Sequence, residues 1–311
     1  MKNNIAILIV SFNRKDYVLK NIEAINKLTY KNHDIILFDN GSTDNTIETV
    51  SQLFPAVKII KSDKNLGGAG GFAQGLEYTY TAGYEYHWCL DDDGRPDAHC
   101  LSILMEEAEK YDNNVVLGPQ IFTDEEESAN EHIWPLIGKY DSVKREVIEY
   151  PEEVKKDLVK SNSTFETASV ALVGLFMHRT VIEKIGYPNL TFFIAGDDVE
   201  YCFRAWENNI KILLVQKATL YHPSNKATIN LLFKKVEIIV APPWKSYYKV
   251  RNSIYTSRLY LTRQKVVKLF LFHLCVMIYL LFNEKNKKHI FKSTIVGLYH
   301  AFTNKLGKYD L

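Results

Sequence analysis

The chain has 311 residues, of which 46% are hydrophobic and 24% are charged. These proportions are typical of a globular protein with a substantial core rather than of a disordered chain, and the length fits one large domain or a domain with an appendage. The net charge of +1 conceals an asymmetry, because residues 226–311 carry 16 Lys and Arg against 3 Asp and Glu, whereas residues 1–225 carry 22 against 34. The basic part is therefore expected to face an anionic partner, either phospholipid or nucleic acid.

The chain is expected to be cytosolic. Its four cysteines show no C-x-x-C spacing and lie among apolar residues, which is typical of reduced structural thiols. Residues 1–5 lead straight into an apolar run without a small-residue cleavage site, so a secretory signal is not predicted.

The first ninety residues alternate between short apolar runs and amphipathic helical stretches. Strands are predicted at residues 5–10, 35–38, 57–60 and 86–90. A first helix is predicted after residue 10, with Val18, Ile22 and Ile25 on its buried face, and further helices are predicted at residues 46–54 and 72–82. This alternation is typical of right-handed crossovers and a mostly parallel, Rossmann-like sheet flanked by helices, so the fold class is α/β.

Polar residues follow each of these strands at its carboxyl end. Ser11 and Asn13 follow the first strand, Asp39 the second, residues 65–71 the third and residues 91–93 the fourth. Open α/β sheets bind ligands at this edge. Turn chemistry would explain any one of these loops, but donors or acids on all four predict one shared binding rim.

Three adjacent carboxylates, Asp91, Asp92 and Asp93, end an aromatic and apolar run that begins at Trp88. Like charges this close disfavour joint ionisation unless a cation or many donors neutralise them. Mg²⁺ and Mn²⁺ prefer carboxylate oxygens. A solvated acidic turn is the commoner reading of an isolated triplet, but the position on the rim favours a metal site.

A glycine-rich stretch, residues 65–75, follows the third strand. Its glycines are expected to let the backbone approach a ligand and to aim amide groups at phosphate oxygens before a helix begins. It also contains a loose dinucleotide fingerprint, Gly68-x-Gly70-x-x-Ala73, with Asp91 about 20 residues further on. This alternative, a nicotinamide-dependent dehydrogenase, is disfavoured because the fingerprint belongs to the first strand–helix unit, where this chain has no glycine.

Three motifs, in this order and spacing, resemble family 2 glycosyltransferases with the glycosyltransferase-A fold. They are Asp39-Asn40-Gly41-Ser42-Thr43-Asp44, Asn65-Leu66-Gly67 and Asp91-x-Asp93. The longer stretch of residues 65–72, followed by the three aspartates, is similar to the galactofuranosyltransferase branch. The resemblance extends through residues 244–252 and so covers roughly four fifths of the chain.

The resemblance implies a donor site and a metal site on the rim. Asp39 would contact uracil, Asp91 and Asp93 would hold Mn²⁺ or Mg²⁺ on the diphosphate, and Asp92 would contact the nucleotide sugar. The other predicted donor-binding residues are Ser11, Asn13, Asn65, Gly67 and Gly68. His222 follows a strand predicted around residues 213–215 and matches the family's metal-binding histidine by position, although a lone histidine is more often structural.

Asp197 and Asp198 are predicted to face the acceptor. Transfer with inversion needs a carboxylate that takes the proton of the acceptor hydroxyl. The family carries such an acid at the second position of a matching pair, so Asp198 is predicted to be the base and Asp197 an acceptor contact. The alternative is an N-cap pair, because a helix containing Tyr201 and Ala205 follows, and both roles can hold together.

The remaining acceptor residues are predicted to be Gly174, Trp244 and Arg251. Gly174 lies in a small, strand-like apolar run over residues 169–177. Trp244 and Arg251 lie in a stretch that resembles the family's helix beside the acceptor site, where Arg251 would meet a pyrophosphate or occupy a surface position.

The region between residues 96 and 160 is predicted to hold two regular elements and one excursion. Residues 96–97 are predicted to start a helix with Leu101, Leu104, Met105 and Ala108 inward, and residues 115–117 form a strand. Residues 124–160 are acidic and are interpreted as an irregular surface excursion, either an acceptor-side flap or a solvated loop.

Residues 266–282 are mostly apolar, with Lys268 and His273 interrupting, and at 17 residues are short for a span that needs about 20. Lysines follow at once within residues 285–288. An apolar face beside basic clusters predicts a helix that lies on anionic lipid, with a buried core helix as the alternative.

The sequence therefore predicts an inverting, metal-dependent glycosyltransferase that moves galactofuranose from its uridine diphosphate donor to a lipid-linked glycan in bacterial surface polysaccharide synthesis. Residues 1–225 would form the catalytic domain, and residues 226–311 a helical region for the acceptor and the inner face of the cell membrane. A rhamnosyl or hexopyranosyl transferase of the same fold stays open. A nucleic-acid partner is not expected, because the basic tail carries no recognised nucleic-acid fold signature.

Overall fold

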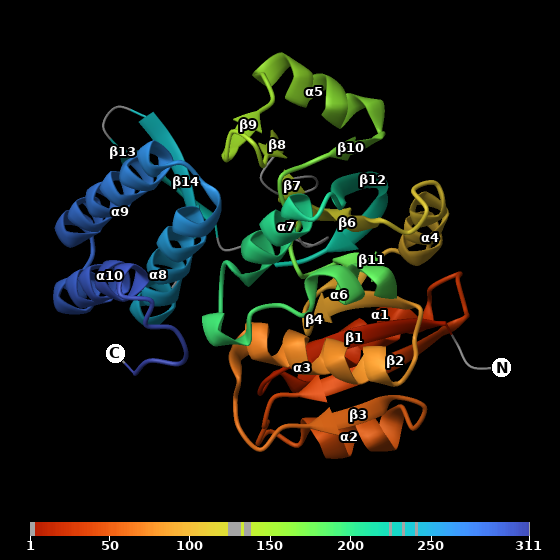
Figure 1. Ribbon diagram of the computed structural model, residues 1–311. Coiled ribbons are helices and arrows are strands. Elements are labelled where there is room, and N and C mark those ends of the chain that lie inside the picture. Colours follow the sequence, from red (N-terminus) through yellow and green to blue (C-terminus); the bar gives the residue numbers. More distant parts are fainter. Residues whose placement is uncertain are drawn as a thin grey trace.

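The computed structural model describes residues 4–123, 132–133, 138–223, 226–231, 234–239 and 242–310 (Figure 1). A mixed ten-stranded sheet with helices on both faces forms the larger part of the molecule, with the strand order β10-β12-β6-β11-β4-β1-β2-β3. The predicted α/β class is confirmed.

The first half of the sheet is parallel, as predicted. Its strands are β1 (Ile5–Ser11), β2 (His33–Asp39), β3 (Lys58–Lys61) and β4 (Tyr86–Asp91). The helices between them are α1 (Lys15–Asn26), α2 (Thr46–Leu53) and α3 (Gly67–Thr81). The register pairs Ser11 with Asp39 and Val10 with Asp91, so the polar ends of three strands meet at one edge.

Strand β1 is apolar throughout because helices cover both faces of the sheet. Ile5, Ile7 and Ile9 belong to one hydrophobic core with side chains of α1, α2 and α4 (Cys100–Glu109). The intervening residues, such as Leu8, belong to a second core with α3, α6 (Arg179–Ile185) and α7 (Asp197–Glu207). The predicted inward positions of the helix at α4, from Leu101 to Ala108, are confirmed as buried.

The second half of the sheet is mixed. Strand β11 (Phe176–His178) runs antiparallel between β4 and β6 (Val115–Phe122), and β12 (Lys211–Tyr221) runs parallel to β6. The shorter members are β5 (Arg95–Pro96), β7 (His132–Ile133) and β10 (Thr164–Glu166).

Two predicted elements in this half are wrong in their extent. Pro96 does not start a helix, because it pairs with Leu220 as part of β5, and α4 begins only at Cys100. The predicted strand over residues 169–177 is reduced to β11, because Gly174 has a φ of +101° and its N–H donates to the carbonyl of Cys89 in a turn. The segment is nevertheless buried, as its apolar sequence requires.

The predicted irregular excursion contains regular structure in the part that the structure describes. Strands β8 (Gly138–Asp141) and β9 (Glu146–Glu149) form a hairpin, and α5 (Glu152–Ser161) follows. Tyr140 is buried, stacks on Phe203 with 4.7 Å between ring centroids, and donates a hydrogen bond to Glu207. Residues 124–131 and 134–137 of the excursion lie outside the described residues.

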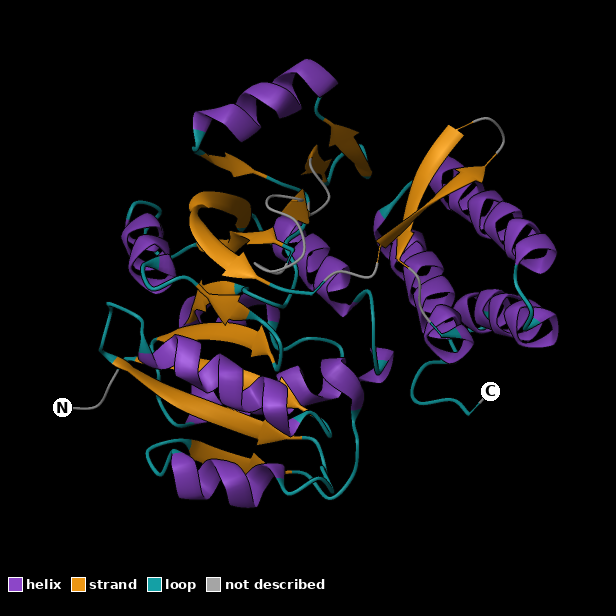
Figure 2. Cartoon of the chain, turned by 180° about the vertical axis from the view of Figure 1, so that it is seen from behind, coloured by secondary structure: helices purple, strands orange, loops and turns teal. Residues whose placement is uncertain are grey.

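Three helices near the carboxyl end stand together beside the sheet, as Figures 1 and 2 show. They are α8 (Pro243–Tyr260), α9 (Arg263–Asn283) and α10 (Lys287–Phe302). A separate hairpin, β13 (Lys226–Leu231) and β14 (Lys234–Ile239), precedes them. Gly297 lets α10 approach α8 closely, since a Cβ there would lie 3.0 Å from the carbonyl oxygen of Tyr247.

Helix α9 is longer than its predicted 17-residue apolar run. It has 21 residues, because Arg263 to Lys265 form its first turn, and among the described residues it is the one helix long and apolar enough to cross a membrane. Only 11% of its apolar window is buried, so the buried core helix considered as an alternative is wrong.

All four cysteines are free, as expected, and Cys89, Cys100 and Cys202 are buried.

Candidate active site

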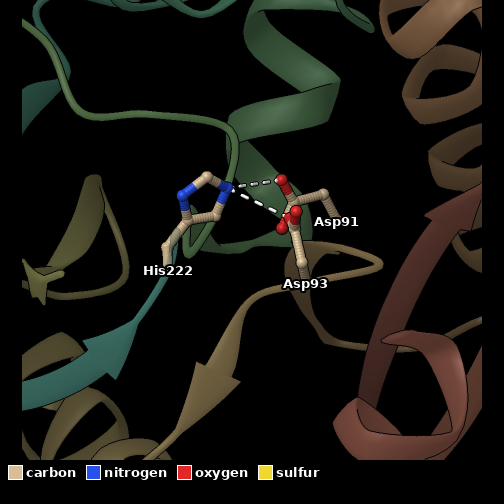
Figure 3. A group of neighbouring side chains, drawn as sticks. All are labelled: Asp91, Asp93 and His222. Carbon is tan, nitrogen blue, oxygen red and sulfur yellow. Dashed lines mark hydrogen bonds and ion pairs between the residues drawn. The ribbon is translucent and has the colours of Figure 1, made fainter. Parts of the chain in front are cut away.

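Three side chains converge where β4 and β12 end. Asp91 is the last residue of β4, Asp93 follows it, and His222 directly follows β12. Strand β5 brings them together, because Arg95 pairs with Tyr221 and folds the chain after the aspartates back onto the end of β12. The His222 Nε2 atom lies 3.0 Å from Asp91 Oδ2 and 3.1 Å from Asp93 Oδ1 (Figure 3).

This cluster fits a divalent cation. One ligand atom from each of Asp91, Asp93 and His222 can be chosen so that all lie within 4.8 Å of one another. The Oδ1 atom of Asp91 is buried without a hydrogen-bond partner, and Asp93 Oδ1 shares the single Nε2 atom of His222 with Asp91 Oδ2. One ring N–H cannot fully satisfy two carboxylates. Two carboxylates and one imidazole form a donor set that suits Mn²⁺ or Mg²⁺.

The charges of the cluster depend strongly on one another. Burial lowers the pKa of His222, but its interactions with Asp91 and Asp93 outweigh this effect and raise the pKa to about 10. Burial raises the pKa of Asp91 against the opposing effect of His222. The pKa of Asp93 is driven well below its usual range, because His222 and Arg14 together outweigh its burial. A bound cation would therefore replace the proton on His222.

Arg14 is a site residue that the sequence interpretation missed. Its Nη1 lies 3.0 Å from Asp92 Oδ1 and 2.7 Å from Asp93 Oδ2, and the Ser11 hydroxyl donates to Asp92 at 3.1 Å. Burial raises the pKa of Asp92 to about 7 although Arg14 opposes the shift. The sequence did contain a sign of this role, because Arg14 lies in the loop after the first predicted strand, at the same edge of the sheet as the three aspartates.

Asp39 presents one free carboxylate oxygen. Its side chain is fully buried, and Oδ2 accepts the N–H groups of Gly41 at 3.2 Å and Ser42 at 2.9 Å. The other oxygen, Oδ1, is buried and has no hydrogen-bond partner. A buried acceptor without a donor is costly, so a ligand N–H group would stabilise Oδ1, although Asp39 is not among the residues that line the adjacent cavity.

Asn13 and Asn65 mainly shape the backbone of the rim. The Asn13 side-chain oxygen accepts the N–H of Thr43 at 2.7 Å and so ties the loop after β1 to the loop after β2. The Asn65 side-chain oxygen accepts the N–H of Gly67 at 2.8 Å in the turn before α3.

The glycine-rich stretch is not the loop that was expected before a helix, and its contact with phosphate stays a prediction. Helix α3 begins at Gly67, so the glycines form its first turns, and the N–H of Ala69 already donates to the carbonyl of Phe193. Packing explains the glycines instead, because a Cβ at Gly71 would lie 2.4 Å from Val10 and one at Gly75 would lie 2.6 Å from Leu8. Among the glycines of α3, Gly68 has open space where its Cβ would be.

A cavity of about 660 Å³ opens beside the acidic cluster. One wall is formed by rim residues, among them the predicted Ser11, Asn65, Gly67, Gly68 and Asp92. The lining also includes the aromatic residues Phe193, Tyr248, Tyr309 and the predicted Trp244, which is 44% exposed. The cavity thus joins the donor rim to helix α8.

Arg251 does not lie at the surface, the position left open for it, because it is fully buried. Its guanidinium donates to the carbonyls of Thr191, Phe192 and Gly307, at 3.3, 2.8 and 2.6 Å. These bonds use most of the donors of the guanidinium, which therefore holds these backbone segments together. Arg251 is not among the residues that line the cavity.

Asn252 adds to these bonds and was not predicted as a site residue. Its side-chain amide donates to the carbonyls of Phe192, Ile194 and Ala195, at 3.1, 3.1 and 2.7 Å. Phe193 and Ala195 both have positive φ, +65° and +66°, which is uncommon outside glycine and requires support from the surrounding structure. The pair on α8 therefore fixes the loop that leads to Asp197 and Asp198.

Asp197 and Asp198 form the first turn of α7. The N-cap position belongs to Gly196, so neither aspartate is the N-cap residue. The Asp198 Oδ1 atom nevertheless accepts the N–H of Val199 in the first turn at 2.8 Å. Burial, followed by the charge of Asp198, raises the pKa of Asp197 to about 7, and burial also raises the pKa of Asp198. Neither carboxylate forms an ion pair within the part of the chain that the structure describes.

Gly174 serves the turn before β11. It is buried, its carbonyl accepts the indole N–H of Trp88 at 3.0 Å, and a Cβ would lie 2.7 Å from Pro119. Its predicted contact with an acceptor stays a prediction.

Comparisons with known proteins agree on one family. The family model for glycosyl transferase family 2 matches residues 6–183. The galactofuranosyltransferase GlfT1 of Mycobacterium tuberculosis (strain ATCC 25618 / H37Rv) is 26% identical over 237 residues, which are 72% of this chain and 71% of that protein. The dTDP-rhamnosyl transferase RfbF of Shigella flexneri is 24% identical over 303 residues, which are 96% of this chain and 95% of that protein.

A solved structure shares the fold. The crystal structure of GalNAc-T7 with UDP, GalNAc and Mn²⁺ superposes on 82% of this chain with a TM-score of 0.57 at 14% identity. This chain spans about half of that one, 47%. The likeness supports the predicted glycosyltransferase-A type of fold.

Proposed function

This chain belongs to glycosyl transferase family 2, and from that premise we propose that it transfers galactofuranose from UDP-galactofuranose to a lipid-linked glycan, with inversion at the anomeric carbon. Membership in the family excludes the nicotinamide-dependent dehydrogenase that the glycine-rich stretch had left open. The observation that carries the proposal is the convergence of Asp91, Asp93 and His222 beside a cavity on the donor rim.

The donor base is assigned to Asp39. Its free Oδ1 would accept the N3–H group of uracil, which is the one ring N–H that a uridine nucleotide offers. Thymine presents the same N–H, so this contact suits a dTDP-sugar equally. A rhamnosyl transferase is therefore the second candidate, and the similarity to RfbF over 96% of the chain favours it.

The metal site is assigned to Asp91, Asp93 and His222, with Mn²⁺ or Mg²⁺ as the ion. Bound there, the ion would offset the negative charge that builds on the leaving diphosphate. Arg14 and Ser11 hold Asp92 in place, so that its carboxylate stays at the cavity wall, where the sugar of the donor would lie.

The base is assigned to Asp198, with Asp197 as a contact for the acceptor hydroxyl. The Asp198 carboxylate would accept the hydroxyl proton while the hydroxyl oxygen bonds to the anomeric carbon and the bond from that carbon to the diphosphate oxygen breaks. Its raised pKa improves it as a proton acceptor near neutral pH. Trp244 and Gly174 remain proposed acceptor contacts.

Nucleotide-sugar binding and transfer test this proposal directly. We expect UDP-galactofuranose and UDP to raise the melting temperature with Mn²⁺ and to do so far less in chelator, because a ligand that binds only the native state stabilises it. Transfer from UDP-galactofuranose, compared with dTDP-rhamnose, then decides between the two candidates. Stabilisation by NAD without any by either nucleoside diphosphate would refute both.

We propose in addition that residues 226–311 form an acceptor-side region that rests on the inner face of the cell membrane. Apolar side chains of α9 and α10 are exposed, including Leu271, Ile278, Phe282 and Phe291, and Phe282 is 82% exposed. Exposed lysines lie beside them at residues 285, 287, 288 and 292. Large exposed apolar patches next to basic groups favour an anionic lipid surface.

Sedimentation with lipid vesicles tests the membrane proposal. We expect binding to phosphatidylglycerol vesicles, weaker binding to phosphatidylcholine vesicles, and loss of binding in Phe282→Ser combined with Phe291→Ser. Binding that resists both high salt and alkaline extraction would show a spanning helix instead, whereas equal recovery without vesicles would refute membrane association.

A further inference from the structure

The segment of residues 305–310 is fixed against the catalytic domain. The N–H of Gly307 donates to the carbonyl of Thr191 at 2.7 Å, and the carbonyl of Gly307 accepts from Arg251. The Tyr248 hydroxyl donates to the carbonyl of Tyr309 at 3.1 Å and accepts the N–H of Tyr309 at 2.9 Å. These bonds hold the segment beside η1 (Leu190–Phe192) rather than leaving it as a free tail (Figure 1).

The same segment forms part of the cavity wall. Lys308, Tyr309 and Asp310 line the cavity together with Arg14 and Asp92 of the donor rim. Tyr309 is half-buried, and its ring centroid lies 5.0 Å from that of Tyr247, so this part of the wall packs against an aromatic side chain of α8. A chain stretch more than 200 residues away from the rim therefore completes the site that takes the donor.

The charges of the described residues around the cavity leave the two phosphates of a nucleotide sugar without a cation that is free to neutralise them, unless a lysine does so. Arg14 is engaged by Asp92 and Asp93, and with a divalent ion it would offset the charge of the three aspartates. A nucleotide sugar then brings a further negative charge on each of its two phosphates. Lys245 and Lys308 are the remaining cations of the lining, and neither forms an ion pair with any residue that the structure describes.

Lys308 is the better placed of the two for a contact with phosphate. Lys245 lies over the ring of Trp244, its own neighbour, at 5.5 Å. The Lys308 Nζ lies 5.7 Å from the ring of Phe193, whose carbonyl accepts from Ala69 in the first turn of α3. Phe193 thus connects Lys308 with the amino end of α3, on the donor side of the cavity.

We propose that Lys308 binds the diphosphate of the nucleotide sugar and that the 305–310 segment is a wall of the donor site. This inference rests on the proposed function and adds to it a residue that carries no family motif. A lysine is suited to this task, because its ammonium donates to phosphate oxygens as a compact point charge.

The test compares Lys308→Gln with Lys305→Gln, which removes the same charge from the same segment but does not line the cavity. Titration calorimetry measures the affinity of each variant for UDP and for uridine in Mn²⁺. We expect Lys308→Gln to weaken UDP binding by about five- to tenfold and uridine binding by less than twofold, since an exposed charged contact contributes modestly. Lys308→Arg should restore UDP binding, and Lys305→Gln should behave as wild type.

Different results separate this inference from the function on which it rests. UDP affinity in Lys308→Gln within twofold of wild type would overturn the inference alone. An equal loss in Lys305→Gln would also overturn it, because that result indicates a general effect of charge. A wild-type chain that binds neither UDP nor dTDP in Mn²⁺ would overturn the proposed function and this inference with it.

Discussion

Two acidic regions of the molecule share their residue type and differ in their partners. The aspartates after β4 face cations, because Arg14 and His222 lie within 3.1 Å of their oxygens. Asp197 and Asp198 at the start of α7 face no cation among the described residues. In the first region His222 and Arg14 drive the pKa of Asp93 down, although burial still raises the pKa of Asp91 and of Asp92. In the second region burial raises the pKa of both aspartates, and no cation in the described part of the chain opposes the shift.

The difference shows how the surroundings of a carboxylate suit it either to bind a metal ion or to exchange a proton. Carboxylates held ionised by neighbouring cations are suited to keep a metal, since metal ligands must be deprotonated. Carboxylates that are buried and unpaired hold a proton more readily and are suited to exchange one. The two regions can be separated by experiment.

Asp198→Asn should give the largest effect. The change is isosteric and removes the proton acceptor, so turnover is expected to fall by about 10²–10⁴-fold. Donor and metal affinity should stay within twofold, because those sites lie on other loops. Transfer kinetics and UDP titration in Mn²⁺ measure the two quantities.

Asp197→Asn is the matched control for this change. It should weaken use of the acceptor and leave more residual turnover than Asp198→Asn. Near-normal turnover in Asp198→Asn would assign the base elsewhere.

Asp93→Asn tests the other acidic region. Loss of a charged ligand should weaken Mn²⁺-dependent UDP binding by at least about 100-fold, beyond the 10–100-fold typical for a group that only supports a ligand. The fold should persist, which circular dichroism would verify. Full transfer activity in chelator would contradict the metal assignment.

Asn252→Ala should give an intermediate effect confined to the α7 region. The carbonyls of Ile194 and Ala195 would lose the Asn252 donor, while that of Phe192 keeps Arg251, so the free energy of unfolding is expected to fall by about 1–3 kcal/mol and turnover by about tenfold. Denaturant unfolding and transfer assays measure these changes. Mn²⁺ affinity that falls as much as turnover would show that the two regions are not independent.

The smallest expected effect is a difference between the pH dependence of Mn²⁺ affinity and that of turnover. His222 has a pKa raised to about 10, and a metal must displace its proton, so apparent Mn²⁺ affinity should rise by up to tenfold per pH unit below that value. As the proposed base, Asp198 must be ionised to act, and its raised pKa shifts the acidic limb of turnover to higher pH than an ordinary aspartate would give. Turnover at saturating Mn²⁺ should level off at a lower pH than metal affinity does.

The elements of the first half of the sheet could be predicted because their signals are local. The run from Ile5 to Val10 is apolar on both faces, and polar residues mark its end, so strand and rim follow from the sequence. The predicted strand boundaries there agree with the structure to within two residues, and the largest difference is at the start of β2.

The glycine-rich stretch shows where local signals fail. Glycine disfavours helices in isolation, which supported a loop. Packing against β1 explains the helix instead, because only residues without a Cβ fit so close to Val10 and Leu8 at positions 71 and 75.

Long-range partners explain the other failures. The surface position that was left open for Arg251 is wrong, because the side chain is buried against carbonyls that lie 56 to 60 residues away in sequence. Arg14 pairs with aspartates nearly 80 residues further on, and no spacing rule connects them. Such contacts depend on the whole fold, and residue type alone does not specify them.

The separation between Asp91 and His222 has a consequence for how the enzyme is made. Their hydrogen bond joins residues 131 positions apart, and β12 must pair with β5 before it can form. At about 5–20 residues per second, roughly 7–26 s of synthesis separate the two residues. The donor-binding half can fold on the emerging chain during that interval, while the cation site waits for His222. A nascent chain would therefore have its proposed donor rim before its proposed cation site is complete.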